Sequence, residues 1–450
     1  MISFLKNRKF DFFSLGVSAT IFYFVIFYLV PIFSLVGVSI KFLPAIDVDN
    51  KALWYSILGI FCFIFGYLNP IAPYLVKKIS NPFKKEWDYK KGFWVFGFIF
   101  ILGWAVKLTK ILMGGYDYLN PSQRFLQNPF YSLFGNLNWL SYIALAIAFI
   151  FYFNLRQKGD KLYKIWGVLA WGAFLLELLY SLPSCSRMSM FTPFIIYLIV
   201  RWYVWERNLK ITLIAAGLMA FILFPLGNAC RTPAILSLYQ INKPQIGEQQ
   251  KIPLNKPQIG EQQKIPLNKL QIGEQQKISF IVNSAKFASD SFLSRVNELS
   301  VFSAIINNSQ SLEYGSSLRE VLLTFSPPRF LWENKPKSAN ISSNEFGHKI
   351  GVLTPDDKTT GVGPTVIGDW YMNFGLFGIA VGMFLTGIIF KIIYNYFIVK
   401  TEASSSGVLI YSFVWIQLIK GMEDWIAPIY VGLFRLLAML LIIHLFLKKK

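Results

Sequence analysis

The sequence predicts an all-α polytopic membrane protein with about ten transmembrane helices and one large extracytoplasmic loop. The composition excludes an ordinary soluble protein, because 54% of the 450 residues are hydrophobic and only 15% are charged, whereas a soluble domain has about 25% charged residues. Long apolar runs recur along the chain, and a membrane-spanning helix needs about 20 such residues. One polar stretch, 228–372, interrupts these runs.

Ten apolar runs account for the predicted spans. They are continuously apolar rather than alternating, and only helices or closed barrels satisfy the backbone inside lipid, so the runs are helices. The sixth run is short, and the ninth is short and interrupted by Gln417. In chain order the runs are 13–39, 53–76, 92–112, 131–153, 165–182, 189–205, 211–227, 374–396, 407–419 and 427–447.

The distribution of charge predicts the side of the membrane that each connection faces. The chain has a net charge of +20, and cytoplasmic loops of membrane proteins are enriched in Lys and Arg. If the N-terminus is cytoplasmic, the inner segments sum to +15 and the outer segments to +5. We therefore expect both termini in the cytoplasm and 228–372 outside. The basic charge is then a topology signal, and we expect no nucleic-acid partner.

Three regions follow from this topology. Residues 1–227 form an N-terminal membrane bundle of about seven spans. Residues 228–372 form the extracytoplasmic loop, and 373–450 form a C-terminal membrane bundle of about three spans. A loop of this length is usually functional or disordered, and this one has features of both.

An internal repeat accounts for the disordered part of the loop. NKPQIGEQQKIPL occupies 242–254 and recurs at 255–267, and an imperfect third copy runs over 268–278. Proline in the copies prevents a regular helix. We interpret 242–278 as a flexible insertion with no catalytic part. An arm that binds an anionic partner is the alternative.

The rest of the loop has the features of folded structure. Apolar residues recur at mostly helical spacing over 280–306, which predicts an amphipathic helix on or re-entering the membrane surface. Two motifs follow, SPPRFLWENKP at 326–336 and GPTVIGDWYMNFG at 363–375. The second motif leads into the eighth predicted span.

The familiar nucleotide, hydrolase and metal motifs are absent from the sequence. It has no P-loop, no G-x-G-x-x-G before a helix, no G-x-S-x-G and no H-E-x-x-H. With two His and three Cys, we predict no metal site and no cofactor. Asp47 and Asp49 form a D-x-D without an identifiable third ligand. Cys185 and Cys230 lie at outer span ends, but nothing in the sequence fixes their distance, so we do not predict a disulfide.

Arginines at the outer face are the candidate ligands for a diphosphate. A guanidinium binds phosphate bidentately and keeps its charge, and a lipid-linked diphosphate would lie at headgroup depth. The alternative for any single arginine is ordinary pairing with a lipid headgroup. The candidates are Arg187, in the turn between the fifth and sixth spans, and Arg231, Arg295 and Arg329 in the large loop.

Candidate catalytic and sugar-binding residues lie in the second half of the loop. His348 could act as a general base at neutral pH, with Glu345 three residues before it. A solvated loop histidine is the alternative. Asp369 lies beside Trp370 and Tyr371, and sugars stack on aromatic rings and hydrogen-bond to carboxylates, which predicts a glycan contact.

Glu177, Arg435 and His444 are ionisable residues within predicted spans. Isolated charges inside a membrane are unfavourable, so we expect Glu177 and Arg435 to form ion pairs or to line a polar cavity. His444 lies near the cytoplasmic end of the tenth span, where we expect it at the membrane interface.

These features together resemble the oligosaccharide repeat-unit polymerases of bacterial surface polysaccharides, the Wzy-type O-antigen polymerases. The resemblance depends on the span number with one late outer loop, on the turn Ser186-Arg187, and on the two loop motifs. Asp369 departs from the pattern, which more often has Glu there, and the repeat at 242–278 is not part of it. The matching motif residues are Pro328, Arg329, Trp332, Lys335, Pro336 and Gly363 to Gly375.

The resemblance implies a membrane glycosyltransferase of GT-C-like fold in the bacterial inner membrane, with the large loop in the periplasm. It would polymerise undecaprenyl-diphosphate-linked oligosaccharide units into O-antigen, capsule or exopolysaccharide. The arginines would hold the diphosphate, His348, Glu345 or Asp369 would be catalytic, and Trp332, Trp370 and Tyr371 would bind glycan. A chain-length regulator and a flippase are expected partners.

Three rival functions stay open at this point. An O-antigen ligase would share the architecture and the donor and differ in the acceptor. A flippase or other transporter usually has repeated groups of spans and short loops, which this sequence lacks. A structural scaffold of an export complex would survive the loss of Arg187 and Arg231.

Overall fold

The structure is a computed structural model, and it describes most of the helical part of the chain. Several residues singled out above lie outside the described residues: Asp47, Asp49, Cys185, Cys230, Arg231, Arg295, Arg329, Trp332 and the repeat at 242–278. The described residues are 11–29, 31–32, 50–84, 86–114, 135, 137–182, 187–218, 298–308, 312–316, 319, 343–353, 355 and 361–449.

Every regular element in these residues is helical, which confirms the all-α prediction for them. In chain order the elements are α2 (Leu15–Phe24), η1 (Val25–Leu29), α4 (Asn50–Leu68), α5 (Ile71–Lys78), η2 (Pro82–Lys84), α6 (Tyr89–Leu112), α9 (Trp139–Gln157), α10 (Tyr163–Ser181), α11 (Arg187–Val200), η3 (Arg201–Trp205), α12 (Leu209–Leu218), α16 (Glu298–Asn308), α18 (Ser343–Lys349), α19 (Thr365–Tyr394), η5 (Asn395–Val399), α20 (Ser405–Gly421) and α21 (Ile426–Leu447).

Six helices of the described part are long and apolar enough to cross a membrane. They are α4, α6, α9, α10, α11 continued by η3, and α19 continued by η5. Two shorter apolar helices, Leu15–Leu29 and Gly432–Leu447, lie among them. The count of about ten spans and the GT-C-like fold therefore stay predictions.

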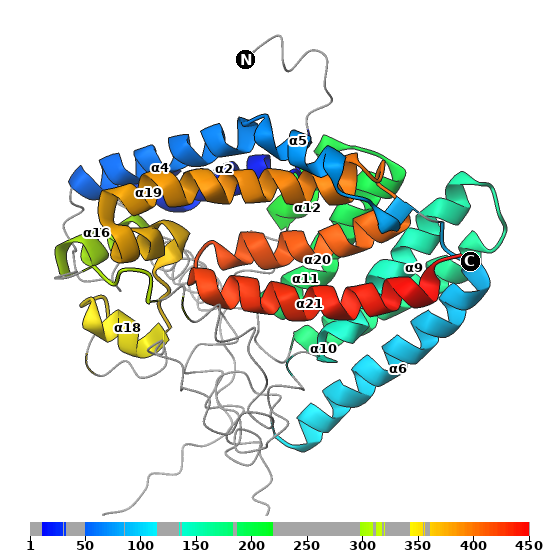
Figure 1. Cartoon of the computed structure of the whole chain (residues 1–450). Helices are drawn as coiled ribbons and strands as arrows, with labels where there is room; N and C mark the ends of the chain where they lie inside the picture. The colour runs from blue at the N-terminus through cyan, green and yellow to red at the C-terminus, as the bar shows by residue number, and fades with distance from the viewer. Residues whose placement is uncertain are drawn as a thin grey trace, which may run out of the picture.

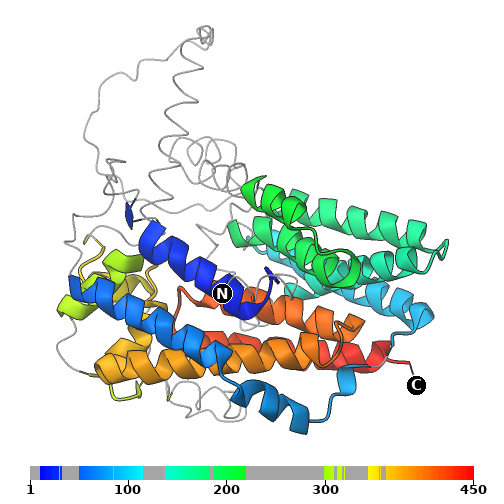
Figure 2. The same cartoon turned by 90° about the horizontal axis from the view of Figure 1, so that it is seen from above.

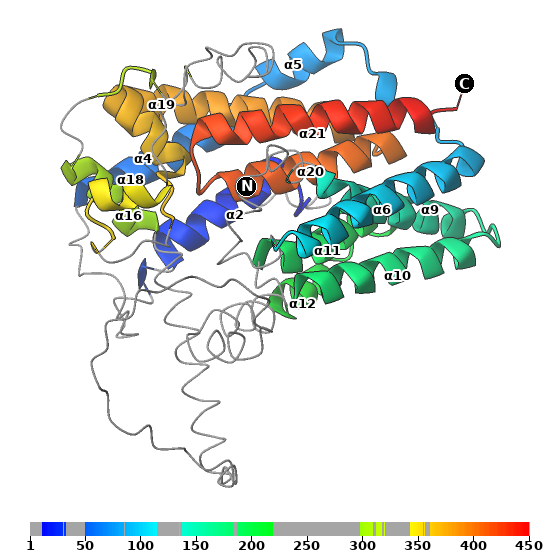
Figure 3. The same ribbon diagram turned by 90° about the horizontal axis from the view of Figure 1, so that it is seen from below.

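The long helices lie side by side in two groups, as Figure 1 and Figure 2 show. In the first group α19 packs along α4 and also contacts α2. In the second, α9 packs against α6, α10 and α11, and every residue from Leu140 to Phe151 is buried. The helix α20 contacts members of both groups and pairs with α21, so it joins them (Figure 3).

The motif GPTVIGDWYMNFG is helical rather than extended. Thr365 begins α19, and the helix is broken at Phe374 and Gly375, where the φ of Gly375 is +61°. Glycine adopts this left-handed conformation without the steric penalty that a Cβ would bring. The break turns the segment 365–373 back onto the rest of α19, where the Trp370 indole N–H donates to Thr386 Oγ1 at 3.3 Å.

The ionisable residues inside the bundle differ in their burial and in their partners. Glu177 forms an ion pair with Lys107, and both side chains are fully buried, which confirms the prediction for Glu177. Arg435 is exposed on α21, and its predicted partner stays a prediction. His444 is buried in the protein: it is 3% exposed, and its Nδ1 lies 2.8 Å from Ser406 Oγ.

A second polar group fastens the N-terminal residues to the bundle. The Asp11 carboxylate accepts hydrogen bonds from the Trp202 indole, the Tyr203 hydroxyl and the Tyr394 hydroxyl, at 3.0, 3.0 and 2.7 Å. These donors come from η3 and from the C-terminal end of α19. The carboxylate therefore holds three separate segments together at the end of the bundle opposite to α16 and α18.

Candidate functional site

A small hydrophobic cluster closes one end of the bundle, beside the first turns of α4 and α19 (Figure 1). We call this cluster the cap. It joins α16, α18, the segment 365–373 and the turn between α20 and α21. Its buried members are Val301, Ala304, Ile305, Phe346, Ile350, Val352, Met372 and Trp425.

Hydrogen bonds and a ring contact fix the pieces of the cap to one another. The Asn308 side-chain amide donates to the Ile350 carbonyl at 3.0 Å, which ties α16 to the residues after α18. The Glu313 amide donates to the Met372 carbonyl at 2.9 Å. The Phe346 and Trp425 rings pack edge to face at 5.1 Å, so α18 rests on the α20–α21 turn. Segments far apart in the sequence thus form one local structure.

Asp369 lies at the centre of this arrangement and is fully buried. Its Oδ2 accepts from the Ile426 backbone N–H at 2.8 Å, and its Oδ1 accepts from the Asn373 side-chain amide at 2.8 Å. A carboxylate at a helix N-terminus satisfies an otherwise unpaired N–H and interacts favourably with the helix dipole. Asp369 therefore caps α21 from a neighbouring helix.

The two aromatic residues after Asp369 differ in their surroundings. The Trp370 ring packs against Gly382, which lies further along α19. Tyr371 is half-buried and lies between the rings of Tyr55 and Phe302, at 6.0 and 5.9 Å. Of the two, Tyr371 is the one placed between α4 and α16.

Glu345 and His348 lie in the short helix α18, not in an irregular loop. Glu345 is exposed and His348 is half-buried, while Phe346 and Gly347 face the protein. The cap thus brings both residues to the same end of the bundle as Asp369, Trp370 and Tyr371. Their helix and Asp369 both contact the α20–α21 turn.

Of the four predicted diphosphate-binding arginines, only Arg187 is in the described residues. It is the first residue of α11. The helix begins close to the buried Lys107–Glu177 pair, since the Tyr142 hydroxyl donates to the Ser189 carbonyl and its ring lies 4.6 Å from Lys107 Nζ.

Two carboxylates of the cap were not predicted from the sequence. Glu298, in α16, is 8% exposed, and Glu423 is exposed in the α20–α21 turn. Burial, and then the charge of Glu423, raise the pKa of the Glu298 carboxyl well above its usual range. A signal for Glu298 was present: it precedes Val301, Phe302 and Ile305 at helical spacing, so it lies on an apolar face.

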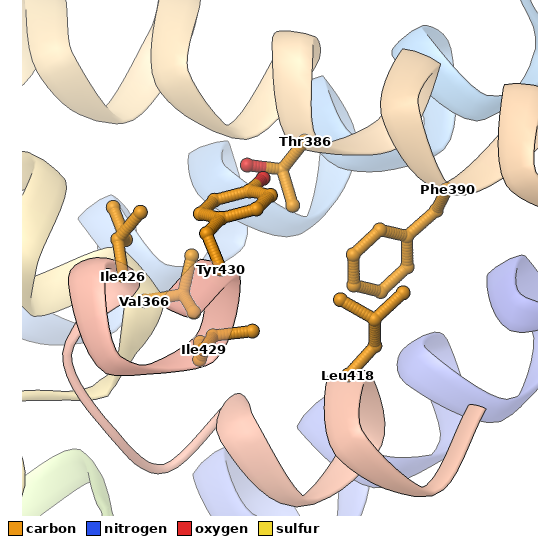
Figure 4. A pocket seen from close by; sticks show the side chains of 7 residues that line it. All are labelled: Val366, Thr386, Phe390, Leu418, Ile426, Ile429 and Tyr430. Carbon is orange, nitrogen blue, oxygen red and sulfur yellow. The ribbon is translucent and has the colours of Figure 1, made fainter. Parts of the chain in front are cut away.

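The cavity next to the motif is too small for a sugar. It lies between α19, α20 and α21, and its volume of about 10 Å³ is the size of a single water molecule. Figure 4 shows its mainly apolar lining, with the hydroxyl groups of Thr386 and Tyr430 on one side.

A larger groove lies on the surface between α2, η1 and α4. Its volume is about 280 Å³, and nearly all of its exposed lining is apolar. The Tyr28 hydroxyl and Ser56 Oγ, 3.0 Å apart, are its polar neighbours. The adjoining η1 contacts α16, where the Phe27 and Phe302 rings meet at 6.3 Å. The groove residues are Thr20, Phe24, Tyr28, Ile57, Ile60, Phe61 and Ile64.

Comparison with known proteins gives one positive finding. Residues 268–434 match the sequence model of the family described as "Putative O-antigen polymerase". Searches of the curated proteins and of the solved structures found no significant match. The matched segment contains every element of the cap and extends into α21. The predicted resemblance is confirmed over residues 268–434, which are similar to the family described as "Putative O-antigen polymerase".

Proposed function

We propose that the protein polymerises oligosaccharide repeat units that are linked through a diphosphate to a polyprenyl lipid, undecaprenol in bacteria. The reaction would take place at the outer face of the inner membrane and would extend O-antigen or a related surface polysaccharide. A chain-length regulator and a flippase would act with it. The cap end of the bundle would face the periplasm, and both termini the cytoplasm.

One observation carries this proposal. The segment that matches the polymerase family, 268–434, is the segment that builds the cap. The cap brings together carboxylates, a histidine and aromatic rings at one end of a bundle of apolar helices. A lipid-linked sugar would present its glycan at this depth, above the membrane, while its lipid stays within it.

The reaction is a substitution at the anomeric carbon of the donor. Arg187, Arg231, Arg295 and Arg329 would bind the diphosphate and stabilise the charge that it gains as it leaves. Tyr371 and Trp332 would contact sugar rings. We propose that Glu345 and His348, on the outer side of α18, contact the acceptor glycan. Asp369 would position α21.

The apolar groove supports a lipid-linked substrate. A polyprenyl chain has no polar groups, and the groove between α2, η1 and α4 has almost no polar lining. It adjoins η1, which contacts the cap helix α16. A lipid chain in this groove would hold its diphosphate near the cap.

Complementation of a strain that lacks the protein tests the function. The wild-type gene should restore a ladder of long glycans on a gel of surface polysaccharide, where the deletion leaves single repeat units. Arg187→Ala and Arg231→Ala should accumulate normally and fail to restore the ladder. Arg207→Ala, at the opposite end of the bundle and only 4.0 Å from Asp11, is the matched control and should restore it.

Other results would support the rival functions. Polymerised but unattached lipid-linked chains in the deletion strain would identify a ligase. Lipid-linked units retained on the cytoplasmic side would identify a transporter. Full activity of both arginine variants would exclude the proposed diphosphate site and favour a scaffold.

A further inference from the structure

Glu298 is a buried carboxyl group whose environment leaves part of it without a partner. It is 8% exposed, and its Oε2 accepts no hydrogen bond in the part of the chain that the structure describes. The helix α16 packs on α4, α19 and η1, and the residues beside Glu298 on that face are apolar. Burying a polar oxygen without a partner is unfavourable, so a bound ligand that donates a hydrogen bond would be stabilised here.

Glu423 is the second carboxylate at this end of the bundle, and unlike Glu298 it is exposed to solvent. It is exposed in the turn between α20 and α21, and its charge acts directly on Glu298. In this pair the Glu298 carboxyl group is removed from water and the Glu423 carboxyl group is solvated. Pairs whose environments differ in this way commonly divide the tasks of acid–base catalysis.

The motif at 363–375 holds the turn that carries Glu423. The Val366 amide donates to the Met422 carbonyl at 3.1 Å, and Asp369 accepts from Ile426 on the other side of the turn. A Cβ at Gly363 would collide with the Glu423 carbonyl oxygen. The three motif residues therefore fix the backbone of the turn that carries Glu423.

We propose that Glu298 is the general base of the polymerase. This inference rests on the proposed function. The acceptor hydroxyl would supply the missing partner of Glu298 Oε2. As the acceptor oxygen forms its bond to the anomeric carbon, its proton moves to Oε2. The bond from that carbon to the diphosphate oxygen breaks, and its electron pair leaves with the polyprenyl diphosphate. The proton then passes from Glu298 to water.

The geometry favours Glu298 over the two residues of α18 for this step. Glu345 is exposed and His348 is half-buried, so water competes for both. A carboxylate that is removed from water binds a proton more strongly than a solvated one, and a base is most effective when its proton affinity suits the ambient pH. Glu298 alone of these three combines burial with a free acceptor oxygen.

The test compares Glu298→Gln with wild type in lipid nanodiscs. The substrate is the pool of lipid-linked repeat units extracted from the strain that lacks the protein, and the product is measured as longer glycans. Glutamine has the shape of the neutral carboxyl and cannot accept the proton, so the variant should fold and lose about 10²-fold or more of the rate. Glu298→Asp should recover part of the loss. Glu313→Gln, a carboxylate of the same end that contacts Ser316, is the matched control and should keep the wild-type rate.

A measurement on the unaltered protein covers the case in which Glu298→Gln does not accumulate. Dicyclohexylcarbodiimide reacts with protonated carboxyl groups in apolar surroundings. It should modify Glu298, identified by peptide mass spectrometry, with a parallel loss of activity, and the lipid-linked substrate should slow both.

Two results would overturn the assignment. One is a folded Glu298→Gln variant that polymerises at the wild-type rate, or that is more active than His348→Ala. The other is complete modification of Glu298 with activity retained. In either case wild type still makes long glycans, so the proposed function stands. Failure of wild type to extend any chain would instead reject the proposed function.

Discussion

The Asp369 carboxylate accepts a hydrogen bond from the Ile426 backbone N–H at 2.8 Å and thereby joins the first turn of α21 to the motif that begins α19. The same side chain accepts from the Asn373 amide. Because Asp369 is fully buried, the Ile426 N–H loses its acceptor when this side chain is removed, whereas Asn373 keeps its bond to the Asp369 backbone carbonyl at 2.8 Å.

Asp369→Ala should therefore destabilise the protein by about 1–3 kcal/mol, the range for leaving buried donors unpaired. Thermal unfolding in detergent, followed by tryptophan fluorescence, measures the change. Asp88→Ala is the control, because Asp88 caps α6 from a partly exposed position with one bond to the Lys90 amide and should cost about 1 kcal/mol or less. Equal unfolding temperatures for the two variants would contradict the capping role.

The Lys107–Glu177 pair should behave as a buried ion pair. Tyr142 and Tyr180 rings lie 4.6 and 4.5 Å from Lys107 Nζ, and both charges are inaccessible to water. Lys107→Ala or Glu177→Ala leaves one charge unpaired and should cost about 3–5 kcal/mol, while Lys107→Met with Glu177→Leu should cost much less. A double-mutant cycle of unfolding free energies measures the coupling. Additive effects would show that the two side chains act independently.

Gly363→Ala should disturb the α20–α21 turn. The new methyl group would meet the Glu423 carbonyl oxygen, which is backbone and cannot rotate away. We expect a lower unfolding temperature and a polymerisation rate reduced at least tenfold in the nanodisc assay. Gly172→Ala in α10 has no atom within 4 Å of the new Cβ and should be neutral or stabilising by about 0.5–1 kcal/mol. Wild-type activity of Gly363→Ala would show that the turn tolerates displacement.

Glu423→Gln should shift the pH dependence of the reaction to lower pH. A base must be ionised, so activity rises with pH through the pKa of Glu298. Burial and the Glu423 charge both raise this pKa. Glu423→Gln removes the charge but not the burial, so the pKa of Glu298 falls. The Tyr23 hydroxyl of α2 also interacts with Glu298. Initial rates between about pH 5 and pH 8 locate the rise, which an unchanged or upward-shifted profile would contradict.

The two exact copies of the internal repeat should be dispensable. Residues 242–267 precede the family match, which begins at 268. Deleting them leaves the family-matched segment intact, so a chain without 242–267 should still restore the polysaccharide ladder. The length distribution on the gel is the measurement. A return to single repeat units, with normal protein levels, would assign the repeat a role in the reaction.

The sequence alone determined the class of the protein and the segment that relates it to a family. Apolar composition is a local property, so the helices α6 and α10 could be located within a few positions, whereas the end of α4 and the start of α9 were not. The charge of Glu177 within an apolar run also sufficed to predict a partner, because an isolated charge there is unfavourable.

Tertiary structure alone decided which side chains of those helices are buried and which residues meet. Lipid and protein interior are equally apolar, so hydrophobicity cannot separate a lipid-facing side chain from a packed one. The exposure of Arg435 and the burial of His444 follow from packing of α21, not from their positions in the sequence. Glu298 and Glu423 are far apart in the chain, and only the cap, which the Asp369–Ile426 bond helps to close, brings them together.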